Sequence, residues 1–211
     1  LGRFSLEEVN LSKILVAYST NSGSTADVAH TIAEEFQVAG RVVEVHPLTA
    51  IPPLDEFDCV ILGAPMIFGW HAAARRFLRR NRKQLAGKKV AYFACALRLT
   101  DDQRETAADI PLTIDPGLVS PPEKPGALSL KERFTTTRHY LTPMLKTTPE
   151  IKPVSVAFFY GKLDLRRLKW WQVLFVLGVV QAKPGDYRDW EFIRHWVKVL
   201  LPIFTEDIAG S

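Results

Sequence analysis

Cysteine is scarce in this chain, which has only Cys59 and Cys95 among its 211 residues. Both lie inside apolar runs, so we expect buried thiols, no disulfide framework and no secreted origin. Residues 1–10 are mixed and polar, and no secretory signal is visible there. The histidines at positions 30, 46, 139 and 195 have no partners at metal-ligand spacing, so we expect no metal site.

Several well-known active-site patterns are also missing. The chain has no G-x-x-x-x-G-K-[ST] loop, which argues against a nucleoside triphosphatase, and no G-x-G-x-x-G fingerprint for a dinucleotide. It has no G-x-S-x-G elbow for a nucleophilic serine. No nucleic-acid-binding module is recognisable, so we expect no nucleic acid partner.

What is present is an ordinary globular composition, with 47% apolar and 24% charged residues and a net charge of +4. A chain of this length can bury one good core, and two comfortable domains would need more residues. We therefore predict a single domain over residues 1–211, with its core at about 13–202.

Apolar runs alternate with helical patterns along most of the chain. Continuous apolar strands between amphipathic helices are typical of a parallel sheet that is covered on both faces. We predict an α/β, flavodoxin-like, doubly wound sheet of five parallel strands in the order 2-1-3-4-5. The predicted strands are 13–18, 41–46, 58–64, 89–96 and 153–160, and the predicted helices are 24–39, 72–85 and about 189–201.

One segment does not fit a minimal domain of this kind. Residues 99–130 contain five prolines, at 111, 116, 121, 122 and 125, and show little periodicity. A stretch of this length without regular structure is either functional or disordered. We therefore treat residues of about 100–130 as an insertion, with a mobile surface loop and a lid over the ligand as the two alternatives.

The loop after the first predicted strand is rich in hydroxyl groups and leads directly into a helix. A helix N-terminus offers free backbone N–H groups and a partial positive charge, and a glycine lets the backbone curl around an anion. The pattern predicts a phosphate site, although a helix cap rich in Ser and Thr would have the same composition. Its residues are Ser19, Thr20, Asn21, Ser22, Gly23, Ser24 and Thr25.

This loop resembles the FMN phosphate loop of flavodoxins, and most closely that of the menaquinone-dependent protoporphyrinogen IX oxidases and their flavodoxin-domain relatives. Three further segments carry the resemblance: residues 63–71, residues 159–163 with the basic, Trp-containing stretch after them, and Asp189-Trp190. The similarity covers about 13–202. The loop after the third strand is about one residue shorter than in that branch, and the proline-rich stretch has no counterpart there.

The resemblance implies that FMN is the cofactor, with its ring between the loops that follow strands 3 and 4. The phosphate would lie at the 19–25 loop. Phe68 and Trp70 are expected to stack on the ring, or alternatively to plug the end of the sheet. The ring-contacting residues implied in this way are Pro65, Met66, Ile67, Phe68, Gly69, Trp70, Cys95, Ala96, Leu97 and Arg98.

Two side chains near the expected ring have open roles. Arg98 would stabilise negative charge at the pyrimidine edge, or would be a solvated surface residue. His71 is a weak candidate for a general acid or base, and a structural role is the alternative. The redox chemistry itself would belong to the flavin.

Positive charge is concentrated in one region, where eight basic residues fall within fifteen positions that contain no acidic residue. The alternatives are a solvated helix face and a surface that attracts anionic lipid headgroups or the propionates of a tetrapyrrole. These residues are Arg75, Arg76, Arg79, Arg80, Arg82, Lys83, Lys88 and Lys89.

A second feature suggests a membrane contact. Residues 165–182 are apolar nearly all round but too short to span a bilayer, and tryptophans beside basic residues are typical of membrane interfaces. A buried helix or a homodimer contact is the alternative. The residues concerned are Arg166, Arg167, Lys169, Trp170 and Trp171.

Together these features predict an FMN-dependent oxidoreductase at the inner face of the cell membrane, in the cytoplasm. It would pass electrons from a small reduced substrate, protoporphyrinogen IX or a related tetrapyrrole, to a membrane quinone. An NAD(P)H:quinone reductase and a non-enzymatic flavodoxin electron carrier remain as alternatives.

Overall fold

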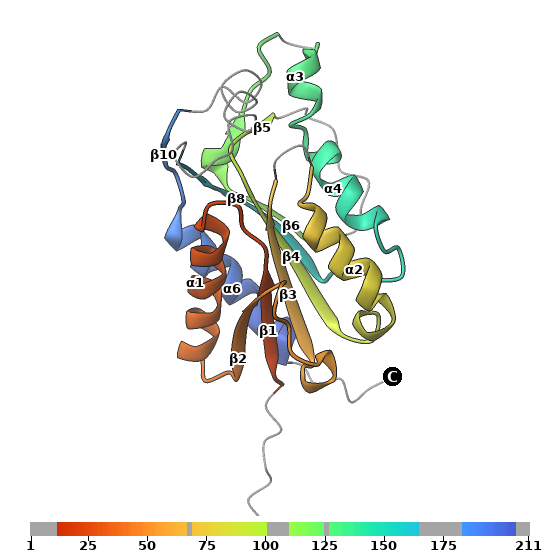
Figure 1. Cartoon of the computed structure of the whole chain (residues 1–211). Coiled ribbons are helices and arrows are strands. Elements are labelled where there is room, and N and C mark those ends of the chain that lie inside the picture. Colours follow the sequence, from red (N-terminus) through yellow and green to blue (C-terminus); the bar gives the residue numbers. More distant parts are fainter. Residues whose placement is uncertain (1–11, 67–68, 101–109, 125–126, 165–182, 206–211) are drawn as a thin grey trace, which may run out of the picture.

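The computed structural model of the chain describes residues 12–66, 69–100, 110–124, 127–164 and 183–205. Within these residues a parallel sheet of six strands has the order β2-β1-β3-β4-β8-β6 (Figure 1). The predicted flavodoxin-like α/β fold is confirmed, and the first five positions match the predicted order, but a sixth strand is added at the edge. The strands are β1 (Ile14–Tyr18), β2 (Val43–Pro47), β3 (Cys59–Pro65), β4 (Lys89–Ala96), β6 (Leu112–Ile114) and β8 (Ser155–Tyr160).

The central strands are buried along almost their whole length. All seven residues of β3 are buried, and so are seven of the eight residues of β4. This explains their continuous apolar sequences, because a strand with helices over both faces has no solvent side.

One face of the sheet is covered by α1 (Ser24–Val38) and α6 (Trp190–Thr205) (Figure 1). Trp196 of α6 is completely buried there, and its indole Nε1 donates a hydrogen bond to Ser155 Oγ at 3.0 Å. A buried tryptophan of this kind fixes the helix on the sheet, because its one polar atom finds its partner on β8.

The prediction that the last helix ends before Pro202 is wrong, because α6 continues through this proline to Thr205. Proline removes a helical hydrogen bond, so the extra turn needs other contacts. Phe204 is buried against the Phe36 ring, with a centroid distance of 5.8 Å, and Lys89 Nζ donates to the carbonyl oxygen of Ile203 at 2.8 Å. Tertiary packing therefore stabilises the turn that the sequence alone argues against.

The opposite face is covered by α2 (Ala72–Leu85) and α4 (Thr137–Lys146), with the short α3 (Leu130–Arg133) before α4 (Figure 1). The sequence pattern did not predict α3 or α4. Helix α4 contains Pro143, yet it buries Tyr140, Leu141 and Met144 against the sheet.

The described part of the proline-rich insertion is built into the sheet edge. Strand β6 pairs with β8, and the Asp115 carboxylate that follows it accepts hydrogen bonds from the N–H groups of Gly117 and Tyr160. A second small sheet joins β5 (Leu99–Thr100) to β7 (Val119–Ser120), with the 3-10 turn η2 (Pro116–Leu118) before β7. The described part of the insertion is therefore an ordered extension of the fold.

A hairpin of β9 (Lys162–Leu163) and β10 (Gly185–Asp186) follows β8. The segment 165–182, with the tryptophans that suggested a membrane contact, lies outside the described residues. Among the helices in the described ranges, none has the length and apolar character needed to cross a membrane. The remaining element, the 3-10 turn η1 (Leu54–Glu56), precedes β3.

Candidate functional site

Loops from the carboxyl ends of four strands meet at one pocket. The parallel arrangement places the ends of β1, β3, β4 and β8 at the same edge of the sheet, where ligands of such folds bind. The pocket has about 440 Å³ of empty space, including its part open to solvent. Its lining residues are Asn21, Ser22, Ser24, Pro65, Met66, Cys95, Leu97, Gly161, Lys162 and Leu163.

The loop between β1 and α1 is held by two hydrogen bonds, one to β3 and one within the loop. The Ser19 N–H donates to Gly63 O at 3.0 Å, and the Thr20 hydroxyl accepts from the Gly23 N–H at 2.9 Å. Gly23 is the N-cap of α1 and has a φ of 94°, in the left-handed region that favours glycine. Among the residues that the structure describes, no side chain caps α1. The N–H groups of its first turn, which have no intrahelical partners, are therefore available to an anion.

The Thr25 hydroxyl adds a buried polar group to this site. Thr25 is completely buried, and its hydroxyl makes no hydrogen bond of regular geometry with the described residues; its near neighbour is the Cys95 thiol. Burial raises the pKa of this thiol to about 12, so the sulfur stays protonated and is no nucleophile. A buried hydroxyl without a good partner fits a site that a ligand oxygen completes.

The loop after β3 forms the next wall. Met66 donates its N–H to Cys95 O at 2.9 Å and forms an antiparallel bridge with Trp70. Gly69, with a φ of 101°, makes the tight return possible. The structure thus brings Pro65 and Met66 to the pocket, and their contact with the flavin ring stays a prediction. Ile67 and Phe68 lie outside the described residues.

Trp70 differs from its expected role as a stacking face. Its side chain is only 1% exposed and packs against Tyr92, with 5.2 Å between the ring centroids. The ring therefore belongs to the core on the α2 side, which corresponds to the alternative that it plugs the end of the sheet.

His71 is the N-cap of α2 and makes two hydrogen-bond contacts through one ring nitrogen, one within the helix start and one to the loop after β1. Its Nδ1 caps the helix by accepting from the Ala73 N–H at 3.4 Å, and it lies 3.1 Å from Ser19 Oγ. Burial, together with the charge of Arg75, lowers the pKa of His71 below its usual value. A neutral imidazole suits the capping role, and the catalytic role stays a prediction.

The residues after β4 divide between the pocket and the core. Leu97 lines the pocket, whereas Ala96 is buried and accepts the Gly161 N–H at 2.8 Å. The carbonyl oxygen of Arg98 accepts the Tyr140 hydroxyl at 2.9 Å. A contact of the Arg98 guanidinium with the flavin stays a prediction.

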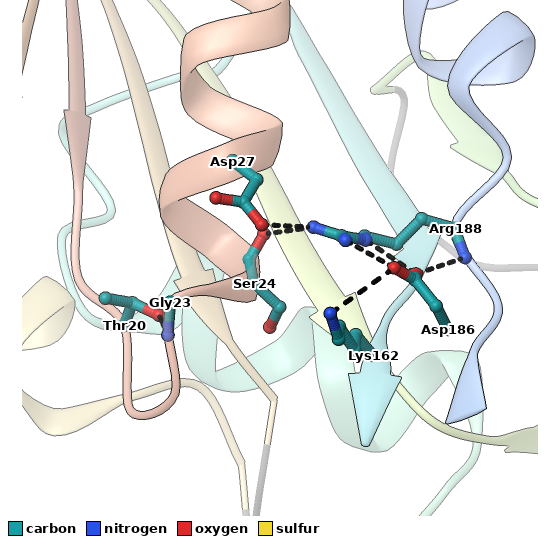
Figure 2. Close-up of polar contacts among 7 residues, drawn as sticks. All are labelled: Thr20, Gly23, Ser24, Asp27, Lys162, Asp186 and Arg188. Carbon is teal, nitrogen blue, oxygen red and sulfur yellow. Dashed lines mark hydrogen bonds and ion pairs between the residues drawn. The ribbon is translucent and has the colours of Figure 1, made fainter. Parts of the chain in front are cut away.

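The hairpin after β8 adds lining residues that the sequence did not single out as site residues. These are Gly161, Lys162 and Leu163. Arg188, just after the hairpin, reaches the first turn of α1, where it contacts Asp27 at 2.7 Å (Figure 2). The available signal was the resemblance of segment 159–163 to the protoporphyrinogen oxidase branch.

A second, larger groove lies between α2 and the loop after β2. It has about 1820 Å³ of empty space, open solvent included, and it reaches the phosphate loop at Ser19 and Thr20. One wall carries Arg76 and Arg80, and the other is mostly apolar, with Pro47, Leu48, Ile51, Pro52 and Pro53.

The structure divides the basic cluster around α2 into two groups, and the half-buried Arg75 belongs to neither. Lys88 and Lys89 reach the carbonyl oxygens of Phe57 and Ile203, so they hold the fold together. Exposed basic side chains remain along α2, namely Arg76, Arg79, Arg80, Arg82 and Lys83. Of these, Arg82 faces Glu150, with 3.7 Å between Nε and Oε1.

Comparison with known proteins gives a family match over most of the chain. A family model described as a flavodoxin domain matches residues 15–187. The chain is also 22% identical over 198 residues to protoporphyrinogen IX dehydrogenase [quinone] of Escherichia coli strain K12, covering 88% of this chain and 93% of that protein.

Two solved structures that are similar to this chain are the following. Rubredoxin oxygen:oxidoreductase from Desulfovibrio gigas has a TM-score of 0.49 and 13% identity, and the match covers 94% of this chain but only 37% of that one. A flavodoxin from Streptococcus pneumoniae has a TM-score of 0.47 and 11% identity, with 91% of this chain and 99% of that one covered.

Proposed function

The chain belongs to the flavodoxin-domain family, and from this premise we propose that it oxidises a reduced tetrapyrrole of the protoporphyrinogen type and passes the electrons to a membrane quinone. The cofactor is FMN, and the general class is an FMN oxidoreductase. When bound, FMN supplies a ring that accepts and donates electrons.

The residues of the pocket fit this cofactor. Loop 19–25 offers hydroxyls, and the first turn of α1 offers amides without intrahelical partners. The buried Thr25 hydroxyl, which has no regular hydrogen-bond partner among the described residues, lies in the same turn. The apolar residues Pro65, Met66 and Leu97 continue the same pocket beyond the loop. This division into a polar end and an apolar end matches a molecule with a phosphate tail and a flat ring.

The observation that carries the cofactor site is this pocket at the end of β1, and the family match over residues 15–187 supports the same assignment. The identity of the substrate is supported by the 22% identity to a protein whose name specifies protoporphyrinogen IX and quinone.

The groove beside α2 supports an anionic, largely apolar substrate. Its mostly apolar wall suits a large ring system, and Arg76 and Arg80 on the other wall suit carboxylates. Propionate side chains on a tetrapyrrole combine both properties.

The membrane contact remains part of the proposal. The exposed basic side chains of α2 would be attracted to anionic headgroups, and Arg166, Arg167, Lys169, Trp170 and Trp171 would add an interfacial anchor. A peripheral contact of this kind would bring the protein to its quinone.

The test is anaerobic reduction of the FMN-loaded protein by separate donors, followed by reoxidation with a menaquinone analogue. We expect bleaching of the flavin absorbance with protoporphyrinogen IX and its recovery with the quinone. Reduction by NADPH alone would instead identify a quinone reductase. Reduction only by a low-potential electron-transfer protein would identify a carrier and contradict the proposed enzyme.

A further inference from the structure

The phosphate loop itself contains no basic residue, although the group it is expected to hold carries about −1.5 to −2 charges at neutral pH. Helix amides and hydroxyls provide hydrogen bonds and about half a positive charge. The described residues that line the pocket include one cation, Lys162 of β9.

The β9–β10 hairpin is held against the N-terminus of α1 by Arg188. This guanidinium contacts Asp27 Oδ2 at 2.7 Å and the Ser24 carbonyl oxygen at 3.4 Å on one side, and Asp186 on the other (Figure 2). Its side chain is only 5% exposed and lies over the Trp190 ring, 4.4 Å from the centroid. Lys162 is therefore positioned by a fixed hairpin, although it lies more than 130 residues beyond the loop in the sequence.

Arg188 also offsets negative charge at the N-terminus of α1. Asp27 lies in the first turn of α1, where its carboxylate would repel a bound phosphate. Pairing with Arg188 offsets that charge, and the fork from Arg188 to Asp186 offsets the second carboxylate of the cluster.

Within the described residues, the Lys162 side chain makes only a long ionic contact, with Asp186. Its Nζ lies 3.7 Å from Asp186 Oδ2, beyond hydrogen-bonding distance, and its side chain is 43% exposed. Asp186 already receives two closer contacts from Arg188, through Nε and Nη2. An ammonium group has three N–H donors, so Lys162 keeps donors for a ligand in the pocket that it shares with Ser22 and Ser24.

We propose that Lys162 is the cationic ligand of the FMN phosphate, supplied by the β9–β10 hairpin in place of a basic residue in the loop. This inference rests on the proposed cofactor site and specifies how the site balances the charge of the phosphate. It also assigns Arg188 as a positioning residue that holds the hairpin on α1.

The test compares the affinity of the apoprotein for FMN and for riboflavin, which has the same ring and no phosphate, by quenching of flavin fluorescence. For Lys162→Gln we expect a loss in FMN affinity of about tenfold to a hundredfold, as for a charge-assisted hydrogen bond, and a riboflavin affinity close to that of the wild type. Lys162→Arg should restore most of the FMN affinity. Lys198→Gln, on the exposed side of α6, is the matched control and should change neither affinity.

Two measurements on the wild type need no variant. Added salt should weaken FMN binding more than riboflavin binding. Inorganic phosphate should compete with FMN and should not compete with riboflavin. Unchanged FMN affinity in Lys162→Gln, or an equal loss for both flavins, overturns the inference. Failure of the wild type to bind either flavin would instead overturn the cofactor site itself.

Discussion

The ring of Phe93 occupies the space that a side chain on Gly63 would need. A Cβ built on Gly63 would lie 1.9 Å from Phe93 Cζ and 2.1 Å from Cε1, far inside any allowed contact. The two residues are paired partners on β3 and β4. Gly63 also accepts the Ser19 N–H through its carbonyl oxygen, so this close approach lies directly beneath the phosphate loop.

Gly63→Ala should lower the free energy of unfolding by about 1–3 kcal/mol or more, because Phe93 has no room to move in a packed core. Urea denaturation measures the change. Gly87→Ala is the matched control, since its Cβ would meet open space, and it should stay within about 0.5 kcal/mol of the wild type. Phe93→Leu should cost less stability in the Gly63→Ala background than in the wild type, and additive losses would refute the steric explanation.

Ser155→Ala should destabilise the fold by about 1–3 kcal/mol, because it leaves the Trp196 indole N–H buried without an acceptor. The same substitution in a Trp196→Phe background should cost much less, since no N–H then remains to be satisfied. Chemical denaturation of the four proteins of this cycle gives the coupling energy. Additive losses would contradict a direct interaction.

Thr25→Val should affect stability and binding in opposite directions. Valine has the same shape and removes a buried hydroxyl that has no regular partner, so the apoprotein should be as stable as the wild type or slightly more stable. FMN binding should weaken by about tenfold, because a hydrogen bond to a charged group is lost. Thermal unfolding and flavin titration measure the two effects, and unchanged FMN affinity would exclude Thr25 from the site.

Stability should fall as the pH drops below the ordinary pKa of histidine, in part through His71. Burial lowers the pKa of His71 in the folded state, so below the ordinary histidine pKa of about 6.5 the unfolded chain takes up a proton that the folded chain resists. The contribution of His71 to the free energy of unfolding is therefore present above that pH and is lost as the pH falls below it. His71→Asn keeps a capping side chain but does not titrate, so its unfolding free energy should change less between about pH 7.5 and 5.5. If the unfolding free energies of the two proteins change with pH in the same way, His71 contributes nothing to the pH dependence of stability.

Neither cysteine should react with iodoacetamide in the native protein at about pH 8, because burial raises the pKa of Cys59 to about 11 and that of Cys95 to about 12. Mass spectrometry should find no alkylation in native protein and two modifications after denaturation. Rapid labelling of Cys95 without labelling of Cys59 would mean that the pocket is more open than the 6% exposure of Cys95 indicates.

Elements with complete local patterns were predictable from the sequence. The predicted helix 72–85 and strand 89–96 coincide with α2 and β4. The first helix, predicted as 24–39, ends at Val38, and Gly40 behind it adopts a φ of 75°. In these segments periodicity, caps and turn residues all favour the same structure.

The missing elements are those where prolines weaken the local pattern. Pro143 lies inside α4, and Pro111 and Pro116 flank β6. Long-range bonds define the added strand: Val156 N–H donates to Pro111 O at 3.0 Å, and Asp115 N–H donates to Phe158 O at 2.9 Å. Such partners are more than 40 residues apart, so no window of sequence contains the signal.

The candidate site also has a part that could be predicted from local sequence and a part that depends on long-range packing. The loop 19–25 is contiguous, so its phosphate-binding chemistry could be predicted from residue types alone. Trp70 was expected at the flavin because it is aromatic and close in sequence, but its burial against Tyr92 depends on the packing of α2. Lys162 shares the pocket with Ser22 only because the hairpin after β8 folds back toward α1.

The short β6 has a consequence for solubility. Without it, β8, with its aromatic sequence SVAFFY, would form the open edge of the sheet and could template pairing with another chain. Instead the edge position is held by three residues bracketed by prolines, and a strand this short offers a neighbouring chain few backbone groups to extend. The insertion thus keeps the aromatic β8 away from the open edge of the sheet.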